Sequence, residues 1–192
     1  NAPGIKHYEA AVQVFRYLKY SREFGLKIKK NMNSFNTLEA YTDADWANCE
    51  DSRKSVSGYL VFWNGNVISW KSKKQSTISL SSTEAEYKSI GDVTKEIMWI
   101  KILLNKIFNI RLNEPTVINE DNQGAIDLAN NETNHNNFKT KHMALRYHFI
   151  RNEINLKNIK LKYVRTISNL ADFLTKSVGK TSILRALKSI NQ

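Results

Sequence analysis

An Asn-Gly pair between two apolar runs is the feature that most limits how this chain can fold. The runs Tyr59 to Trp63 and Val67 to Trp70 are rich in aromatic and β-branched residues, and Asn64-Gly65 lies between them. Asn and Gly both tolerate the positive φ angles that a tight type I′ turn requires. The sequence therefore predicts two antiparallel strands joined in a hairpin.

Strand and helix patterns alternate on both sides of this hairpin. The segment Leu38 to Asp43 alternates as a strand, with Leu38, Ala40 and Thr42 on one face and Glu39, Tyr41 and Asp43 on the other. Further strands are predicted at 116–119 and 159–164, and helices at 81–107, from 122 onward, at 140–156 and at 169–176, with one more after Gly179 to Ile190.

An amphipathic helix is predicted before the first strand. Its apolar residues recur at steps of three and four, and they are Tyr8, Ala11, Val12, Phe15 and Leu18. Such spacing is typical of one side of a helix, which here ends near Gly25. That apolar side needs a partner surface.

Composition and length limit the class of protein. At 192 residues, 41% of them hydrophobic, the chain predicts one well-packed globular core rather than a disordered tail. The single cysteine, Cys49, excludes a disulfide framework and a cysteine-based zinc site within one chain, and it fits a reducing, intracellular setting. No segment approaches the roughly 20 apolar residues that span a bilayer.

The net charge of +11 is concentrated near the C-terminus. Residues 1–137 carry 17 basic and 16 acidic side chains, whereas residues 138–192 carry 12 basic and 2 acidic ones. Such an excess favours binding to phosphates, because neutralising a nucleic-acid backbone releases counterions. A merely solvated surface is the alternative, and a membrane surface is a weaker one because the basic residues lack a clean apolar face.

Four acidic residues lie far apart in the sequence, each where the pattern changes between strand, turn and helix. They are Asp43, Glu86, Asp121 and Asp172. Hard divalent cations need oxygen ligands, high negative charge density and a rigid frame. Acids gathered at one point of a basic protein indicate metal-assisted chemistry on a polyanion.

Helical period separates Glu86 from its neighbour Glu84. The apolar stripe of the helix at 81–107 contains Ile90, which lies one turn after Glu86 at about 100° per residue, whereas Glu84 projects to the opposite side. Glu84 is therefore predicted to form a capping box with Ser81. Glu86 is left as an inward carboxylate, which is costly to bury unless it is paired or binds metal.

The other acids also have local explanations. Asp121 follows a strand and precedes a helix, where an ordinary N-cap would account for it. Asp172 falls in a predicted first helical turn, where a capping or helix-dipole role would suffice. Four such acids in the order strand, helix, strand, helix are harder to explain in this way.

Five motifs carry a resemblance to a known family. They are Tyr41 to Ala47, Ser69 to Gln75, Ser81 to Tyr87, Glu120 to Ile126 and Leu170 to Lys176. In this order they resemble the ribonuclease H domain of copia-type LTR retrotransposon Pol polyproteins. Upstream, His7 to Lys19 resembles the helical tail of the preceding reverse transcriptase module.

The resemblance implies an α/β, ribonuclease H-like fold in which helices flank a mixed five-stranded sheet. It places the catalytic, metal-binding tetrad on Asp43, Glu86, Asp121 and Asp172. In that family two Mg²⁺ ions, roughly 4 Å apart and replaceable by Mn²⁺, activate a water and stabilise the leaving 3′ oxygen. By the same resemblance Asp43 bridges both ions. Glu86 and Asp121 then complete the shell of one ion, and Asp172 that of the other.

The implied substrate is the RNA strand of an RNA/DNA hybrid. Its 2′-hydroxyl groups line a wide, shallow minor groove that amide side chains can read. Asn122 and Gln123 directly follow the third acid and are placed for that contact, while Lys71, Lys73 and Lys74 could hold phosphates. The alternative explanation for Asn122 and Gln123 is the ordinary polarity of a first helical turn. For the three lysines it is a strand end that faces solvent.

The chain departs in one respect from many cellular enzymes of this fold. Those carry a mobile histidine just before the fourth acid, whereas residues 164–169 contain none. His142 and His148 belong to the predicted helix at 140–156 instead. Catalysis is therefore expected to be slower, or to depend more on the metals alone.

The resemblance also predicts organisation and setting. Residues 1–33 form the tail of the reverse transcriptase module, 34–178 the ribonuclease H domain and 179–192 a C-terminal helix. The predicted function is hydrolysis of hybrid RNA during reverse transcription, in cytoplasmic virus-like particles, with the reverse transcriptase module as partner and no membrane. An inactive or domesticated nucleic-acid-binding module is the alternative, and a strand-transfer enzyme acting on DNA ends is a third possibility.

Overall fold

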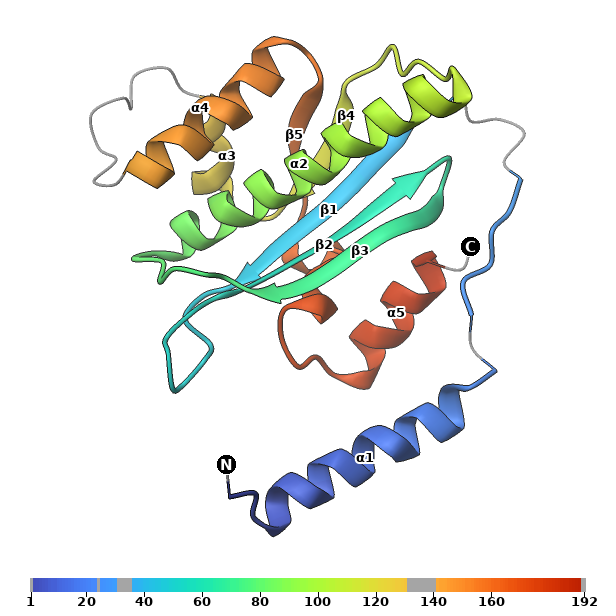
Figure 1. Ribbon diagram of the computed structural model, residues 1–192, viewed down its shortest axis with the longest axis vertical. Helices are drawn as coiled ribbons and strands as arrows, with labels where there is room; N and C mark the ends of the chain where they lie inside the picture. The colour runs from blue at the N-terminus through green and yellow to red at the C-terminus, as the bar shows by residue number, and fades with distance from the viewer. Residues whose placement is uncertain (1, 24, 31–35, 131–140, 191–192) are drawn as a thin grey trace.

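A mixed five-stranded sheet forms the centre of the protein in a computed structural model that describes residues 2–23, 25–30, 36–130 and 141–190 (Figure 1). Its strands are β1 (Leu38–Asp45), β2 (Val56–Trp63), β3 (Asn66–Lys74), β4 (Thr116–Glu120) and β5 (Ile159–Tyr163), in the order β3-β2-β1-β4-β5. The first three pair antiparallel, whereas β4 pairs parallel with both β1 and β5. The predicted fold class is confirmed.

The hairpin forms where the Asn-Gly pair predicts it. Asn64 has φ 50° and Gly65 has φ 79°, and Trp63 pairs with Asn66 across the turn. Both strands extend beyond the predicted runs, to Val56 on one side and Lys74 on the other. Local turn chemistry therefore forms the hairpin, and an irregularity between Val61 and Phe62 shifts the register of the pairing farther along the strands.

Helix α2 (Ser82–Phe108) covers one face of the sheet (Figure 1). Its predicted apolar stripe is buried against β1 and β2, and includes Ile90, Val93, Ile97, Ile100 and Leu104. Helices α3 (Gln123–Asn130) and α4 (Lys141–Asn155) add to the same core cluster. The predicted start of α4 at Thr140 lies outside the described residues.

The opposite face of the sheet carries a smaller cluster, in which Leu60, Phe62 and Val67 pack with Ile190. Ile190 ends helix α5 (Lys180–Ile190). Before α5 the sequence predicts a helix at 169–176, and this prediction is wrong. One short 3₁₀ turn, η2 (Thr166–Ser168), ends just before this segment, and the segment itself contains a second one, η3 (Asp172–Leu174). Asn169 separates them because its side chain accepts a bond from Ala171 N and donates to Thr42 O of β1.

Helix α1 (Ile5–Ser21) stands apart from the sheet (Figure 1) and ends four residues before the predicted Gly25. None of its residues is buried among the described parts of the chain, and Tyr8, Phe15 and Leu18 are 54–72% exposed. The domain limits stay predictions, and the one between 33 and 34 falls outside the described residues. No described helix is both long and apolar enough to cross a membrane.

Candidate active site

Three of the four predicted acids meet at one end of the sheet. Asp43 lies near the end of β1, Glu86 lies in the first turns of α2, and Asp121 directly follows β4. One carboxylate oxygen from each lies within 4.8 Å of the others. Because β1 and β4 run parallel side by side, their carboxyl ends reach the same edge, and α2 packs over β1 with its N-terminus there.

Asp43 is held in a buried position. It is 2% exposed, and the Thr175 hydroxyl donates a hydrogen bond to its Oδ2. Burial raises the pKa of Asp43 to about 6, although the Thr175 hydrogen bond and the nearby Lys176 oppose the shift. A carboxylate that is buried and close to other acids favours a cation as its neighbour.

Glu86 is the inward carboxylate that helical period predicts. It is buried, and its Oε2 has no hydrogen-bond partner among the described residues. Burial raises its pKa far above the ordinary range, and the neighbouring charge of Glu120 adds to the shift. A buried carboxylate oxygen without a hydrogen-bond partner, beside other carboxylates, fits the role of a metal ligand.

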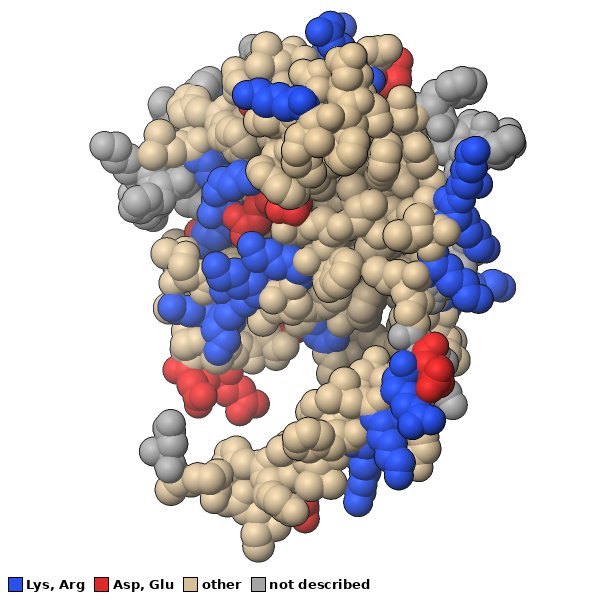
Figure 2. Space-filling view, turned by 45° about the vertical axis from the view of Figure 1, so that its right-hand side comes forward, with Lys and Arg blue, Asp and Glu red and all other residues tan. Residues whose placement is uncertain are grey.

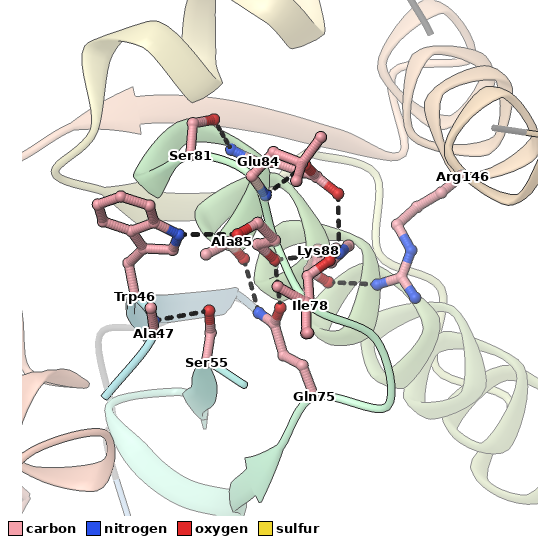
Figure 3. A network of polar contacts seen from close by, with 12 residues as sticks. Trp46, Ala47, Ser55, Gln75, Ile78, Ser81, Glu84, Ala85, Lys88 and Arg146 are labelled. Atoms are coloured by element: carbon pink, nitrogen blue, oxygen red, sulfur yellow. Dashed lines mark hydrogen bonds and ion pairs between the residues drawn. The ribbon is translucent and has the colours of Figure 1, made fainter. Parts of the chain in front are cut away.

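Glu84, unlike Glu86, makes hydrogen bonds and an ion pair at the N-terminus of α2 (Figure 3). Ser81 Oγ accepts a bond from Glu84 N, and Glu84 Oε2 accepts one from Leu80 N, one residue before the cap. Its Oε1 lies 2.8 Å from Nζ of the buried Lys88, which also donates to Ile78 O and Ser79 Oγ. Glu84 is therefore committed to the helix cap and to an internal ion pair.

Asp121 is not the N-cap of α3. The capping side chain is Asn122, whose Oδ1 accepts a bond from Ala125 N at 2.9 Å. The local explanation that the sequence offered for Asp121 thus belongs to its neighbour. Asp121 itself is half-buried, and its carboxylate points toward Asp43 and Glu86.

Asp172 lies beside the group of three rather than within it. Its Oδ1 is 2.5 Å from Lys176 Nζ, and its charge contributes to the raised pKa of Asp43. Thr175 and Lys176, in the same short turn, thus contact one acid each. The structure brings Asp43, Glu86 and Asp121 together directly and places Asp172 next to Asp43 through this turn.

Sequence reasoning missed Glu120, the last residue of β4. It is 0% exposed, and its Oε1 accepts bonds from Asp121 N at 3.1 Å and Asn122 N at 3.0 Å. Burial raises its pKa well above the ordinary range, and the amide bonds from Asn122 and Asp121 oppose that shift. Strand alternation would have found it, because Glu120 lies two residues after the buried Ile118.

The donor set fits a hard divalent cation such as Mg²⁺ or Mn²⁺. All the candidate ligands are carboxylate oxygens, and neither sulfur nor imidazole belongs to the group. Oxygen-only sites suit Mg²⁺ and Mn²⁺, whereas zinc favours nitrogen and sulfur. The unpartnered Oε2 of Glu86 supplies a free ligand atom in a rigid frame.

Comparisons with known proteins place the chain among retroelement sequences. It is 41% identical, over 94% of its length, to the retrovirus-related Pol polyprotein from transposon RE1 of Arabidopsis thaliana. It is 40% identical over 93% to that from transposon TNT 1-94 of Nicotiana tabacum. The chain belongs to the retrotransposon Pol family. It spans 12% and 13% of these two relatives, and no protein-family model matches it.

Solved structures identify the fold of this Pol segment. LC11-RNase H1, isolated from compost, matches 80% of the chain over 99% of its own length, with a TM-score of 0.51 and 15% identity. The same enzyme in complex with an RNA/DNA hybrid matches 72% of the chain over 94% of its own length, with a TM-score of 0.51 and 12% identity. The Pol segment therefore has the ribonuclease H-like fold.

The predicted phosphate-binding lysines of this Pol segment lie along the edge strand β3. Lys71 pairs with Tyr59 and Lys73 with Ser57, so both side chains point to the α2 side of the sheet. Both are exposed, and basic side chains outnumber acidic ones on the face shown in Figure 2. Lys74 is also exposed, but its Nζ contacts Cys49 Sγ at 3.0 Å and helps to lower the pKa of that thiol to about 7.

The predicted readers of the 2′-hydroxyl lie at the start of α3. Asn122 uses its Oδ1 for the cap, and its Nδ2 has no hydrogen-bond partner among the described residues. Gln123 is exposed, and its Nε2 donates to Asp127 Oδ1 at 2.9 Å. The hydrogen bonds of the first turn of α3 thus occupy one polar atom of each of these two side chains. The amide Nδ2 of Asn122, next to Asp121, takes no part in the cap.

Proposed function

We propose that the chain hydrolyses the RNA strand of RNA/DNA hybrids with two divalent cations, Mg²⁺ or Mn²⁺, during reverse transcription. The observation that carries this proposal is the convergence of Asp43, Glu86 and Asp121 within 4.8 Å. The fold of a hybrid-binding ribonuclease H and homology to Pol polyproteins support it. When bound, such ions activate a water and stabilise the leaving oxygen of a phosphodiester.

The chain's own residues divide this work. Asp43 would bridge both ions, with Glu86 and Asp121 on one and Asp172 on the other. The Thr175 hydroxyl orients the Asp43 carboxylate, and Lys176 balances the charge of Asp172. Thr175 and Lys176 thus contact Asp43 of β1 and Asp172 of η3, the two acids on this side of the site.

Substrate choice would rest on the groups beside the acids. Asn122 Nδ2 donates to a 2′-hydroxyl, which DNA lacks, and exposed lysines of β3 contact phosphates without reading sequence. The partner of the apolar side of α1 would be the reverse transcriptase module of the same polyprotein, since the chain spans only a small part of its relatives. We place this activity in cytoplasmic virus-like particles.

Cleavage of a labelled hybrid tests the proposal. With Mg²⁺ or Mn²⁺ the chain is expected to cut the RNA strand of a hybrid, to leave double-stranded DNA intact and to stop when the metal is chelated. Binding of the hybrid without product, with both metals supplied, would favour the inactive-module alternative. Preferential cutting at DNA ends would point to a strand-transfer enzyme.

Replacing the exposed lysines of β3 is expected to weaken hybrid binding without stopping cleavage. The double variant Lys71→Ala/Lys73→Ala should raise KM about 3- to 10-fold and lower the slope of log affinity against log salt by about 1 to 2. Titration of the hybrid at several salt concentrations measures both. Lys106→Ala is the control, because Lys106 is exposed on α2 about 30 Å along the helix from Glu86. An equal slope in wild type and double variant would exclude phosphate contacts at these lysines.

A further inference from the structure

Glu120 is a fully buried acid beside the predicted metal ligands and is not one of them. Its backbone is fixed within the sheet, because Glu120 pairs with Tyr163 of β5 and its carbonyl accepts a bond from Val164 N at 2.9 Å. Its side chain is fully buried, and Oε2 has no hydrogen-bond partner among the residues described. The fold therefore keeps a carboxylate in a place where a charge is costly.

The bonds of Glu120 are directed at the connection between β4 and α3. One oxygen, Oε1, accepts both Asp121 N and Asn122 N, at 3.1 and 3.0 Å. Asn122 in turn caps α3 through Ala125 N. The backbone amides of both residues in this connection, Asp121 and Asn122, thus donate to Glu120. The buried last residue of β4 therefore sets the direction in which the chain leaves the sheet.

We propose that Glu120 is a positioning residue whose Oε1 fixes the backbone amides of Asp121 and Asn122, and through them the metal-binding carboxylate and the amide that reads the substrate. This inference rests on the proposed function for the role of those two side chains. Residues that orient metal ligands in this way change metal affinity or activity by roughly 10- to 100-fold when they are replaced.

Substitutions can separate positioning from charge. In Glu120→Gln the amide oxygen can accept both backbone bonds, so Mn²⁺ affinity and kcat should stay within about 3-fold of wild type. Glu120→Ala removes both bonds, and it should lower Mn²⁺ affinity and kcat by roughly 10- to 30-fold each. KM for the hybrid should change less, because the exposed lysines are untouched.

The control lies on the same strand. Asn119 is 1% exposed and donates two hydrogen bonds, to Glu39 Oε1 and Ala40 O, on the other face of β4. Asn119→Ala should therefore lower the melting temperature without changing Mn²⁺ affinity or kcat. Calorimetric titration of the free protein with Mn²⁺ gives an affinity that does not depend on turnover.

The results decide the proposal in each case. Loss in Glu120→Ala with retention in Glu120→Gln supports it. Equal loss in both variants overturns it in favour of a direct charge effect, and a lower melting temperature alone overturns it in favour of a structural role. If Glu120→Ala does not fold, Glu120→Asp replaces it, because the shorter side chain withdraws the acceptor and should lose affinity. Asp121→Asn in the same series tests the proposed function separately, since its failure to abolish cleavage would contradict that function alone.

Discussion

Asp43→Asn is expected to lower kcat on hybrid RNA by at least about 1000-fold, which corresponds to about 4 kcal/mol of activation free energy. Asp43 interacts with more of the site than the other acids do. One of its carboxylate oxygens lies within 4.8 Å of those of Glu86 and Asp121, and it accepts a hydrogen bond from the Thr175 hydroxyl. The charge of Asp172 also contributes to its raised pKa. An amide oxygen is a weaker ligand for a hard cation than a carboxylate. Single-turnover cleavage with saturating Mn²⁺ measures the loss.

The same substitution is expected to stabilise the metal-free fold at pH 7. Burial raises the pKa of Asp43 to about 6 from an ordinary 3.8, so the unfolded chain releases this proton first as the pH rises. The free energy of unfolding therefore falls as the pH rises from about 4 to about 6, and it stays lower at higher pH. Removing the charge should raise the free energy of unfolding at pH 7 by about 1–3 kcal/mol, which corresponds to a melting temperature higher by roughly 2–10 °C. At pH 4 the two proteins should melt together.

Glu39→Gln is the matched control for Asp43→Asn. Glu39 is a half-buried carboxylate on the same face of β1, four residues earlier, and it accepts a bond from Asn119 rather than contacting the acids. Its replacement should leave kcat within about 2-fold of wild type. Cleavage by Asp43→Asn at the wild-type rate would contradict the proposed metal site, whatever its melting temperature.

The parts of the site that sequence predicts are those set by local rules. Helical period distinguishes Glu86 from Glu84, and the structure uses Glu84 in the cap at Ser81 and in the ion pair with Lys88. Turn chemistry likewise fixes the hairpin, because positive φ angles at Asn64 and Gly65 depend on those two residues alone. Such features need no knowledge of distant segments.

The parts that sequence misses depend on contacts between distant segments. The helix predicted at 169–176 fails because Asn169 bonds across the fold to Thr42 O, which no local pattern reveals. The Thr175 hydroxyl on Asp43 and the Oε1 of Glu120 on two amides are of the same kind. For Asp121, the N-cap explanation competed with a metal role until the structure assigned the cap to Asn122.

Gly58→Ala is expected to lower kcat by roughly 100-fold, because displacements near 1 Å can cost that much in a catalytic site. Gly58 pairs directly with Asp43, and a Cβ at Gly58 would lie 2.8 Å from Leu174 Cβ and 2.8 Å from Thr175 Cγ2. Both contacts involve atoms close to the backbone of η3, so the turn itself must move. Asp172 and Thr175 would move with it.

Metal binding shows which half of the site Gly58→Ala disturbs. Asp43, Glu86 and Asp121 are carried by β1, α2 and the end of β4, so affinity for the first Mn²⁺ should fall by about 10-fold at most, less than the loss in cleavage. Cleavage should nevertheless fall, because Asp172 and the hydroxyl that orients Asp43 are displaced. Calorimetry and single-turnover cleavage on the same preparation separate the two effects.

Gly91→Ala is the matched control, because its Cβ would also meet atoms at 2.8 Å, here Cδ of Arg146. That neighbour is part of the Arg146 side chain, which bonds to Lys88 O and Asp92 and can adjust these bonds without moving the backbone. Alanine also favours the interior of α2 by about 1 kcal/mol over glycine, which offsets the lost packing. Gly91→Ala should therefore keep kcat within about 3-fold. Full activity in a folded Gly58→Ala protein would show that close contact between β2 and η3 does not position the fourth acid.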